Sequence, residues 1–469
     1  MCAHAEAVPV GVLPARDADH AIDAPLMGGP EDLERVIDEH RVGCVLLAVP
    51  GAMHLLIRTL AERVERAGAT ARWLAPLGDT LAGRTGATPG ALDLAALIGR
   101  QARPVDAALV RGVVAGKRVL ITGAGGSIGS EIARIVAAHD PEEVILMERS
   151  ENALFEIDRE LGALGVPRRA VLHDVVEGAR TLALMRQLAP HAVFHAAAHK
   201  HVPMMEDHPG AAVTNNVFGT KAVLDGALEA GAERFVLIST DKAVHPTSVM
   251  GATKRLAELY VRSRAHDTPT RCSLVRFGNV LGSACSVLPI WDRQIASGGP
   301  ITITDERMTR YFMTIPEAAS LVIQSAAIPQ GEDAGVYVLD MGEPVRIADL
   351  ARRLLAQRGV EGGVGIEVTG VRPGEKLYEE LAYASESLAP TSVAGVRAWS
   401  GDAPARADVD RMIALLNAVR SAEDPGEVVR VLVTCVPEMR RPEAIDTPMP
   451  VVTRAEIPNT PRTEASHAA

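Results

Sequence analysis

The chain has 469 residues, a formal net charge of -11 and 47% hydrophobic residues, which is enough apolar material for a large buried core. The acidic balance, without basic runs carrying interleaved aromatic residues, excludes a nucleic-acid surface, and apolar runs broken by Pro or Gly predict no membrane span in this chain. Five cysteines without CxxC spacing predict free thiols in a reducing cytoplasm.

The first part of the chain alternates amphipathic helices with short apolar strands. The helical period lies at residues 31–42 and 53–68, and the expected strands lie at 43–50 and 70–77. This βαβ pattern has no glycine-rich first turn, so we expect no nucleotide site in it. We interpret residues 1–92 as an N-terminal α/β domain and the Gly- and Pro-punctuated residues 93–116 as a connector.

A second α/β series begins at residue 117. Its expected strands are 117–123, 142–148, 168–174, 191–198, 234–240 and 271–280. Helical segments lie between these apolar strands, which predicts a Rossmann-type parallel sheet covered on both faces, within a domain over 117–436. From about residue 287 the shorter elements indicate a smaller C-terminal substrate lobe, and the Pro- and Thr-rich residues 437–469 are expected to be a disordered tail.

The stretch "VLITGAGGSIGSEIA" predicts a dinucleotide site. Gly123, Gly126 and Gly129 follow a strand and open a helix, where they allow a tight turn and close approach of a pyrophosphate to the helix N-terminus. Glu148 ends the next strand, where a carboxylate accepts hydrogen bonds from a ribose and favours NAD. Arg149 beside it suits a 2′-phosphate, so NADP stays open.

Other cofactor contacts are expected at the ends of the later strands. Asp174 and Val175 follow the third strand and are expected to edge the adenine, with a helix cap as the alternative role of Asp174. The remaining expected contacts are Ser127, Ile128, Ala196, Ala197, Ala198, Asn216 and Lys254.

The reaction site is expected in "STDKAVHPTSVMGATK". The strand at 234–240 delivers Thr240, Asp241 and Lys242 to the sheet edge where open α/β sheets bind ligands, although a polar turn capped by Asp241 is the alternative. Lys254 follows Met250 by four residues on one helix face, where a lysine can hold a ribose and lower nearby pKa values. Short-chain dehydrogenases carry a tyrosine where Met250 stands, and methionine cannot carry a proton.

From about residue 94 to 437 the chain resembles the CapD-like polysaccharide biosynthesis proteins, nucleotide-sugar 4,6-dehydratases of the extended short-chain dehydrogenases. The motifs that carry the resemblance are "GAGGSIGSE", "SENALFEI", "FHAAAHKHVPMME", "ISTDKAVHPTSVMGATKR", "RFGNVLGS", "TRYFMTIPEAA" and "RPGEKLYEEL". The large, usually membrane-attached branch of the family has Met in place of Tyr. Measured against that branch, the N-terminal domain is truncated and the transmembrane helices are missing.

The resemblance implies removal of water from UDP-N-acetylglucosamine through bound NAD, giving a 4-keto-6-deoxy sugar for surface polysaccharide or glycan synthesis. Lys242 is then the expected C5 base, because a lysine near the cofactor's positive charge and Lys254 is partly neutral. Asp241 is the expected acid for the C6 hydroxyl, and Thr240 orients the C4 hydroxyl. Met250 leaves that hydroxyl without an evident base.

The family's substrate contacts map onto Lys200, Asn279, Arg310, Arg372 and Lys376, and the alternative for both arginines is a surface salt bridge. No metal is expected, since the reaction needs none. Cys285 departs from the family's glycine, and "TSVAGVRAW" replaces its usual Thr-x-His-Pro-Lys stretch. We expect a homo-oligomer, because the helix that carries Met250 is a common dimer face in the family. A 4-epimerase and a non-catalytic nucleotide-binding protein are the competing hypotheses.

Overall fold

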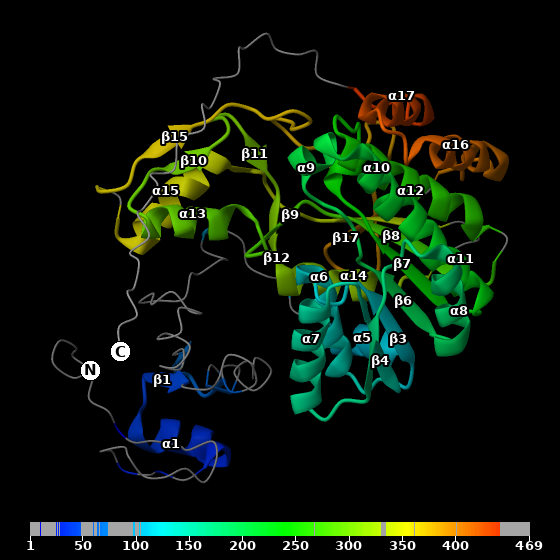
Figure 1. Cartoon of the computed structure of the whole chain (residues 1–469). Helices are drawn as coiled ribbons and strands as arrows, with labels where there is room; N and C mark the ends of the chain where they lie inside the picture. Colours follow the sequence, from blue (N-terminus) through cyan, green and yellow to red (C-terminus); the bar gives the residue numbers. More distant parts are fainter. Residues whose placement is uncertain are drawn as a thin grey trace, which may run out of the picture.

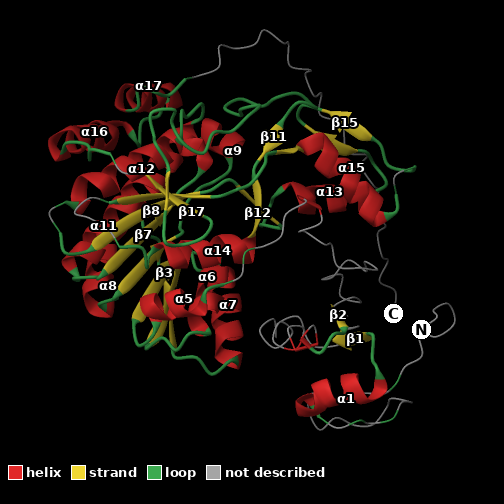
Figure 2. Ribbon diagram, turned by 180° about the vertical axis from the view of Figure 1, so that it is seen from behind, coloured by secondary structure: helices red, strands yellow, loops and turns green. Residues whose placement is uncertain are grey.

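The computed structural model describes residues 30–47, 105–266, 268–329, 334–360, 362–399 and 401–440, with scattered residues between 10 and 29 and between 60 and 103. A nine-stranded sheet between two layers of helices forms the main body, and a smaller lobe lies beside one edge of it (Figures 1 and 2).

The described part of the N-terminal region confirms the βαβ pattern. Helix α1 (Leu33–His40) precedes β1 (Cys44–Leu47), and β1 pairs in parallel with β2 (Thr70–Trp73). Leu33, Ile37, Leu47, Leu60 and Val64 form its small core. The remainder of the expected 1–92 domain lies outside the described residues.

The predicted parallel strands are all present in the main sheet. They are β3 (Arg118–Thr122), β4 (Glu143–Glu148), β5 (Arg168–Leu172), β6 (Ala192–His195), β7 (Arg234–Ile238) and β8 (Arg271–Arg276). The strand order is β16-β17-β13-β8-β7-β6-β3-β4-β5, and β3 to β8 and β13 (Gly335–Leu339) run in parallel. The order reverses between β3 and β6, the point where such sheets bind ligands.

Helices cover both faces of the sheet, as expected for strands that are apolar on both sides. One face carries α5 (Ala107–Val114), α6 (Ser127–Ala137), α7 (Glu151–Ala163) and α14 (Ile315–Ser325). The other carries α8 (Gly178–Leu188), the π-helix η3 (Val213–Gly219), α11 (Thr220–Glu229) and α12 (Val249–Ala265). The short helices α9 (Val202–Asp207) and α10 (Pro209–Ala212) lie between α8 and η3 in the chain.

The connector prediction for 93–116 is wrong for its second half. Asp106 caps α5 by accepting hydrogen bonds from the backbone of Ala108 and Leu109, and Val110, Val113 and Val114 are buried against the main sheet. Helix α5 is therefore part of the main body. A short amphipathic helix after a Gly-rich stretch does not reveal from its sequence that it packs on a distant sheet.

The lobe is built from two separate stretches of the chain. The first holds α13 (Val287–Ala296) and β10 (Ile301–Ile303), and the second holds α15 (Ile347–Arg358) and β15 (Ile366–Val368), which pairs in parallel with β10. Two strand pairs join the lobe to the body, β9 (Asn279–Leu281) with β12 (Phe312–Thr314) and β11 (Thr309–Arg310) with β14 (Val345–Arg346). The first helix of the lobe begins at Val287, and α14 and β13 return to the body.

The last described segment packs on the body. Strands β16 (Ala389–Pro390) and β17 (Val396–Trp399) add an antiparallel edge to the sheet, and α16 (Arg406–Val419) and α17 (Pro425–Cys435) cover α12 (Figure 1). Because these helices bury α12, its outer face is covered within the chain.

The expected tail begins later than predicted. Met439 is buried, and the amide of Arg440 donates to the carbonyl of Pro246, so the packed chain continues past 436 to at least 440. Residues 441–469 lie outside the described residues. Within the described part of the chain, no helix is both long and apolar enough to span a membrane.

Candidate active site

The glycine-rich turn between β3 and α6 forms a cradle of backbone. Gly123 has φ +65°, and a Cβ built on it would lie 2.8 Å from the backbone of Ala197. A Cβ on Gly129 would lie 2.1 Å from the carbonyl oxygen of Gly123, so only glycine lets α6 start this close to the strand. Gly126 caps α6 without a side chain, which leaves the first amide groups of the helix available to an anion.

A cavity lies in front of this cradle at the carboxyl ends of β3, β4, β5 and β6. The predicted residues that line it are Gly123, Gly126, Glu148, Arg149, Asp174, Val175, Ala196, Ala197 and Ala198. Ser127 and Ile128 lie in the first turn of α6, and Ser127 Oγ accepts a hydrogen bond from the amide of Ala284 at 3.1 Å. The cavity therefore gathers residues that were predicted from four separate strand ends.

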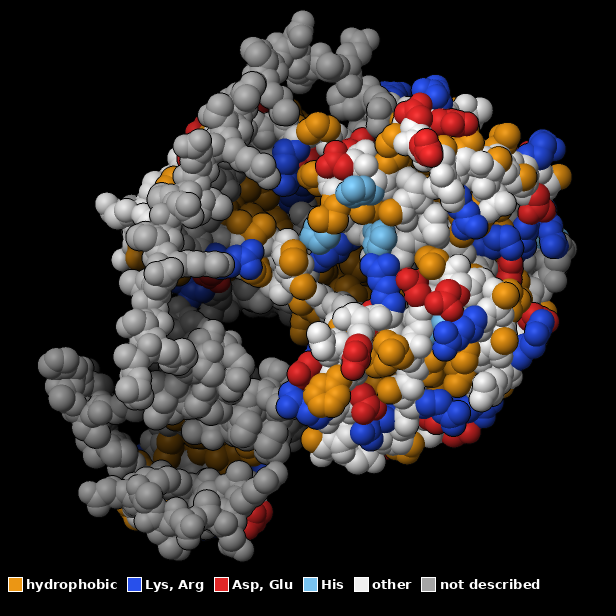
Figure 3. Space-filling view, viewed as in Figure 1, with side chains coloured by type: hydrophobic (Ala, Val, Ile, Leu, Met, Phe, Trp, Pro, Cys, Tyr) orange, Lys and Arg blue, Asp and Glu red, His pale blue; other side chains and the backbone are white. Residues whose placement is uncertain are grey.

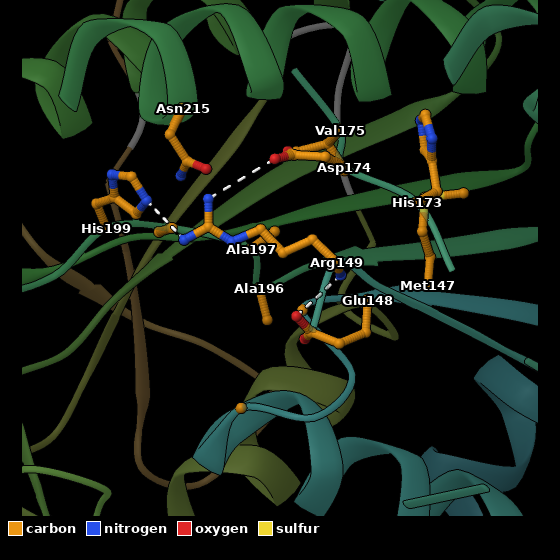
Figure 4. Close-up of a pocket in the computed structure, with 13 residues that line it drawn as sticks. Met147, Glu148, Arg149, His173, Asp174, Val175, Ala196, Ala197, His199 and Asn215 are labelled. Atoms are coloured by element: carbon orange, nitrogen blue, oxygen red, sulfur yellow. Dashed lines mark hydrogen bonds and ion pairs between the residues drawn. The ribbon is translucent and has the colours of Figure 1, made fainter. Parts of the chain in front are cut away.

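Glu148 is fixed at one wall of the cavity (Figure 4). Its carboxylate accepts hydrogen bonds from the amides of Gly125 at 3.2 Å, Arg149 at 2.9 Å and Ser150 at 3.0 Å. The Arg149 side chain extends across the cavity to His199, 2.8 Å away, and towards Asp174, 3.7 Å away. A fixed carboxylate and an arginine already engaged by an acid favour a ribose diol over a 2′-phosphate at this position.

Asn216, a predicted cofactor contact, is not among the residues that line the cavity. Its buried side chain accepts from the amide of His199 at 2.8 Å and donates to the carbonyl of His199 and to Thr253 Oγ1, each at 3.0 Å. Asn216 thus ties the end of β6 to α12, while its neighbour Asn215 lines the cavity from the π-helix η3. The two asparagines are adjacent in sequence, and both lie in η3, whose π-helical turn is wider than that of an α-helix.

Thr240, Asp241 and Lys242 form one hydrogen-bonded unit at the end of β7. Thr240 Oγ1 donates to Asp241 Oδ1 at 2.8 Å, and Lys242 Nζ donates to the same oxygen at 3.0 Å. Lys242 also donates to Asn279 Oδ1 at 3.2 Å. Asp241 is fully buried, and its Oδ2 has no hydrogen-bond partner among the described residues. The structure therefore brings together a hydroxyl, a carboxylate and an ammonium, with Asn279 beside them.

Glu379 is a member of this cluster that the sequence did not single out. Its Oε1 lies 3.5 Å from Lys242 Nζ and 3.9 Å from Arg310 Nε, and its side chain is 2% exposed. Glu379 belongs to the motif "RPGEKLYEEL", but three glutamates stand within six residues there. Only the fold shows which of them points inward.

Lys242 is charged in the ligand-free protein. Burial alone would lower its pKa, but the carboxylates of Asp241 and Glu379 outweigh that effect, and the pKa of Lys242 is raised. The expectation of a partly neutral Lys242 concerns the site with NAD bound and stays a prediction. The sequence did not reveal the second carboxylate, Glu379.

Lys254 lies in a dry part of the site, and its Nζ donates to the carbonyl of Ile238 at 2.7 Å. Burial lowers the pKa of Lys254 to about 8, although Glu258 opposes the shift. His195 lies nearby between Thr122 and Thr220, at 2.7 Å and 3.0 Å, and burial together with the Lys254 charge lowers the pKa of His195 to about 3. Met250 is 3% exposed and belongs to the core that surrounds α12.

The predicted substrate residues are only partly brought together. Arg310 is buried and donates to the carbonyls of Thr309 and Leu377, which holds it near Glu379. Lys200 and Arg372 both act on His201, whose pKa is lowered first by burial and then by these two charges.

Lys376 and Arg372 also have hydrogen-bond partners within the chain. Lys376 Nζ donates to the carbonyl of Val244 at 2.8 Å, and Arg372 pairs with Glu375 at 2.6 Å. Histidine and basic side chains gather around the hollow between the body and the lobe (Figure 3). The Arg372 side chain is 58% exposed. Arg372 therefore forms the expected surface pair and still faces solvent.

The loop that follows β9 closes over the start of α6. Lys200 Nζ donates to the carbonyl of Ala284 at 3.0 Å, and burial lowers the pKa of Lys200. Cys285 has φ +57°, a left-handed conformation in which glycine is less strained. The expected change in this turn is thus local strain at Cys285, which is exposed.

A buried ionic network lies next to the Thr240–Asp241–Lys242 unit. Arg276 makes two hydrogen bonds to Glu258 at 2.7 Å each and two to Glu386 at 3.0 and 2.7 Å. Glu258 in turn accepts from Ser239 Oγ at 2.7 Å, directly before Thr240. Among the described residues there is no cluster of His, Cys, Asp or Glu arranged to hold a metal ion.

Known proteins share both the sequence and the fold. The capsular polysaccharide biosynthesis protein CapD of Staphylococcus aureus is 44% identical over 367 residues, which is 77% of this chain and 61% of that protein. The chain thus spans about three fifths of the length of CapD. A UDP-N-acetylglucosamine 4,6-dehydratase (inverting) of Campylobacter jejuni is 32% identical over 277 residues, covering 58% of this chain and 79% of that protein. A UDP-glucose 4-epimerase of Rickettsia canadensis is 34% identical over 284 residues, with the same coverage of 58% and 79%.

Among solved structures, Pen from Bacillus thuringiensis superimposes with a TM-score of 0.58 at 32% identity, over 63% of this chain and 92% of that one. DesIV, a dTDP-glucose 4,6-dehydratase of Streptomyces venezuelae solved with NAD bound, shares the fold with a TM-score of 0.51 at 22% identity, over 56% and 88% of the two chains. The polysaccharide biosynthesis protein family model matches residues 119–399. The chain belongs to this family of polysaccharide biosynthesis proteins.

Proposed function

We propose that the chain is a nucleotide-sugar 4,6-dehydratase that converts UDP-N-acetylglucosamine to a UDP-4-keto-6-deoxy-N-acetylhexosamine. The observation that carries the proposal is the Thr240–Asp241–Lys242 unit, in which a hydroxyl and an ammonium donate to one buried carboxylate. An elimination needs an acid and a base beside each other, whereas a 4-epimerase needs neither group at C5 and C6.

The proposed cofactor is NAD. The cradle at Gly123, the open N-terminus of α6 and the fixed carboxylate of Glu148 fit a dinucleotide. Lys254 lies buried near the end of β7, where a ribose beside the reacting carbon is expected. When bound, NAD supplies a hydride acceptor and donor that oxidises the sugar at C4 and reduces it at C6.

The residues of the site divide the proton transfers between them. Lys242 accepts the C5 proton, and Asp241 gives a proton to the departing C6 hydroxyl. Thr240 donates to Asp241, so a proton from the C4 hydroxyl can pass through Thr240 to Asp241 along an existing hydrogen bond. This route supplies Asp241 with the proton that it later gives to C6, and it needs no acidic group at Met250.

The substrate is proposed to lie in the hollow between the body and the lobe. Lys200 and Arg372 bring positive charge close to His201 at its rim, which suits a diphosphate. Asn279 and Arg310 sit beside the catalytic unit. We expect the reaction in the cytoplasm, where Cys44, Cys272, Cys285 and Cys435 stay free. A homo-oligomer stays a prediction, and the covered α12 does not offer the expected dimer face.

The proposal is tested by incubating the purified protein with UDP-N-acetylglucosamine and following the sugar by NMR. A 4-keto-6-deoxy product supports the dehydratase, UDP-N-acetylgalactosamine supports an epimerase, and unchanged substrate supports a non-catalytic protein. In deuterated water, Lys242→Ala should lose deuterium entry at C5. Lys117→Ala is the matched control, because Lys117 pairs with Glu233 at the opposite end of the sheet. Normal dehydration by Lys242→Ala would show that another group is the base.

Met250 provides a second test of the same scheme. Because its side chain is packed in the core around α12, Met250→Leu keeps the volume and should retain activity within a few-fold. If that variant folds but is inactive, methionine has a role in the reaction that the relay through Thr240 does not provide.

A further inference from the structure

The inference concerns the proton that Lys242 carries, and it rests on the proposed function. Lys242 must lose a proton before it can accept one from C5. Its nearest acceptor, Asp241, is already required to take the proton of the C4 hydroxyl through Thr240. One acceptor cannot hold both protons, so a second one is needed within reach of Lys242.

Glu379 lies where this second proton acceptor is needed. Its Oε1 lies 3.5 Å from Lys242 Nζ, which also donates to Asp241 Oδ1 at 3.0 Å. Its Oε2 is buried and has no hydrogen-bond partner among the described residues. The charged groups that face Lys242 are Asp241, Glu379 and Arg310, and Arg310 is 3.9 Å from Glu379, beyond hydrogen-bonding distance.

We propose that Glu379 stores the proton of Lys242 during turnover and is a positioning residue that acts through Lys242. In this step an N–H bond of Lys242 breaks and an O–H bond forms on Glu379, so the ion pair becomes a neutral pair with no change in net charge. Dry surroundings favour that exchange, because burial penalises both charged forms.

The proton count then closes. Lys242 takes the C5 proton, while Asp241 takes the C4 hydroxyl proton through Thr240 and passes it to the C6 hydroxyl, which leaves as water. Lys242 returns its proton to C5, and Glu379 returns the stored proton to Lys242. No proton has to leave for solvent at any stage, so the rate should be independent of pH near neutrality.

The test is the pH dependence of kcat for Glu379→Gln with UDP-N-acetylglucosamine, read by NMR or by the absorbance of the keto sugar. At pH 7 we expect kcat to fall about tenfold or more, with KM within about twofold, because Lys242 must now lose its proton to water. The kcat should then rise up to about tenfold for each pH unit between pH 7 and 9, whereas the wild type stays flat.

Glu367→Gln is the matched control, since Glu367 is an exposed glutamate of β15 in the same lobe. Wild-type kcat in Glu379→Gln at pH 7, or a loss that is the same at every pH, would overturn the inference. If that variant does not fold, Glu379→Ala with added formate replaces it: rescue of kcat by formate supports the proton store, and lack of rescue refutes it. A wild type without dehydratase activity would instead refute the proposed function.

Discussion

Replacing Arg276 tests whether the buried ionic network holds the catalytic strand end. Arg276 is fully buried and satisfies Glu258 and Glu386 with four hydrogen bonds of 2.7 to 3.0 Å. Arg276→Met removes the cation and leaves both carboxylates buried, and breaking one buried pair costs about 3–5 kcal/mol. Arg255 stays 3.3 Å from Glu258 and limits that loss. We expect the free energy of unfolding to fall by about 4 kcal/mol at pH 7.

The pH dependence of this loss follows from Glu258. Burial alone would raise the pKa of Glu258, but Arg276 and Arg255 overcome it and lower the pKa to about 2. In the wild type this contribution to stability is complete above pH 4.5 and is lost as the pH falls through about 2. In Arg276→Met, Glu258 keeps only Arg255 against the burial that raises its pKa, so part of the penalty for its buried charge is relieved as the pH falls. The difference in the free energy of unfolding between the wild type and Arg276→Met should therefore become smaller as the pH falls from 7 to 5.

The assay is urea denaturation followed by circular dichroism at both pH values. Arg307→Met is the control, because Arg307 pairs with Asp305 at the surface with 66% of its side chain exposed. An exposed pair of this kind should cost under about 1 kcal/mol. A loss below about 1 kcal/mol for Arg276→Met, or a difference that widens towards pH 5, would refute the reasoning.

Three further changes have defined outcomes. Lys254→Met should abolish activity yet raise the free energy of unfolding at pH 7 by about 1–3 kcal/mol, because a buried lysine with a pKa of about 8 is charged at pH 7 at a cost in stability. For the same reason, the stability of the wild type should rise between about pH 8 and 10.5. Retained activity in Lys254→Met would contradict the role of Lys254. Gly123→Ala should weaken NAD binding about tenfold or more by calorimetry, since its Cβ would meet the backbone of Ala197, whereas Gly165→Ala, with φ +70° but open space, should bind normally. Cys285→Gly should raise the melting temperature by relieving about 1 kcal/mol of left-handed strain, and a lower melting temperature would show that the Cys285 side chain contributes packing.

The sequence predicted the parallel sheet and most of the cofactor cavity because both depend on local patterns. Gly123 follows one apolar strand and Glu148 ends the next. Both residues therefore lie at the same edge of the sheet, whatever the sequence of the remaining chain. The position of α5 was missed, since its few apolar residues do not say which surface they cover.

Glu379, Asn215 and the charge of Lys242 could not be predicted from the sequence. Glu379 reaches the site from a segment far along the chain, and its effect on Lys242 depends on a distance of 3.5 Å. Asn215 lines the cavity, whereas Asn216 bonds to His199, and both lie in the π-helix η3. These features depend on long-range contacts and on the phase of a helix, and the pattern of neighbouring residues indicates neither of them.

The packing of the final helices on α12 has a consequence for synthesis on the ribosome. The amide of Arg440 bonds to Pro246 in the catalytic turn region, and Glu438 pairs with Arg255 at 3.0 Å. The strands from β3 to β8 can therefore emerge from the exit tunnel and pair while one side of α12 is still bare and apolar. Until the last of these residues has been translated, the nascent chain exposes an apolar surface that is prone to aggregation.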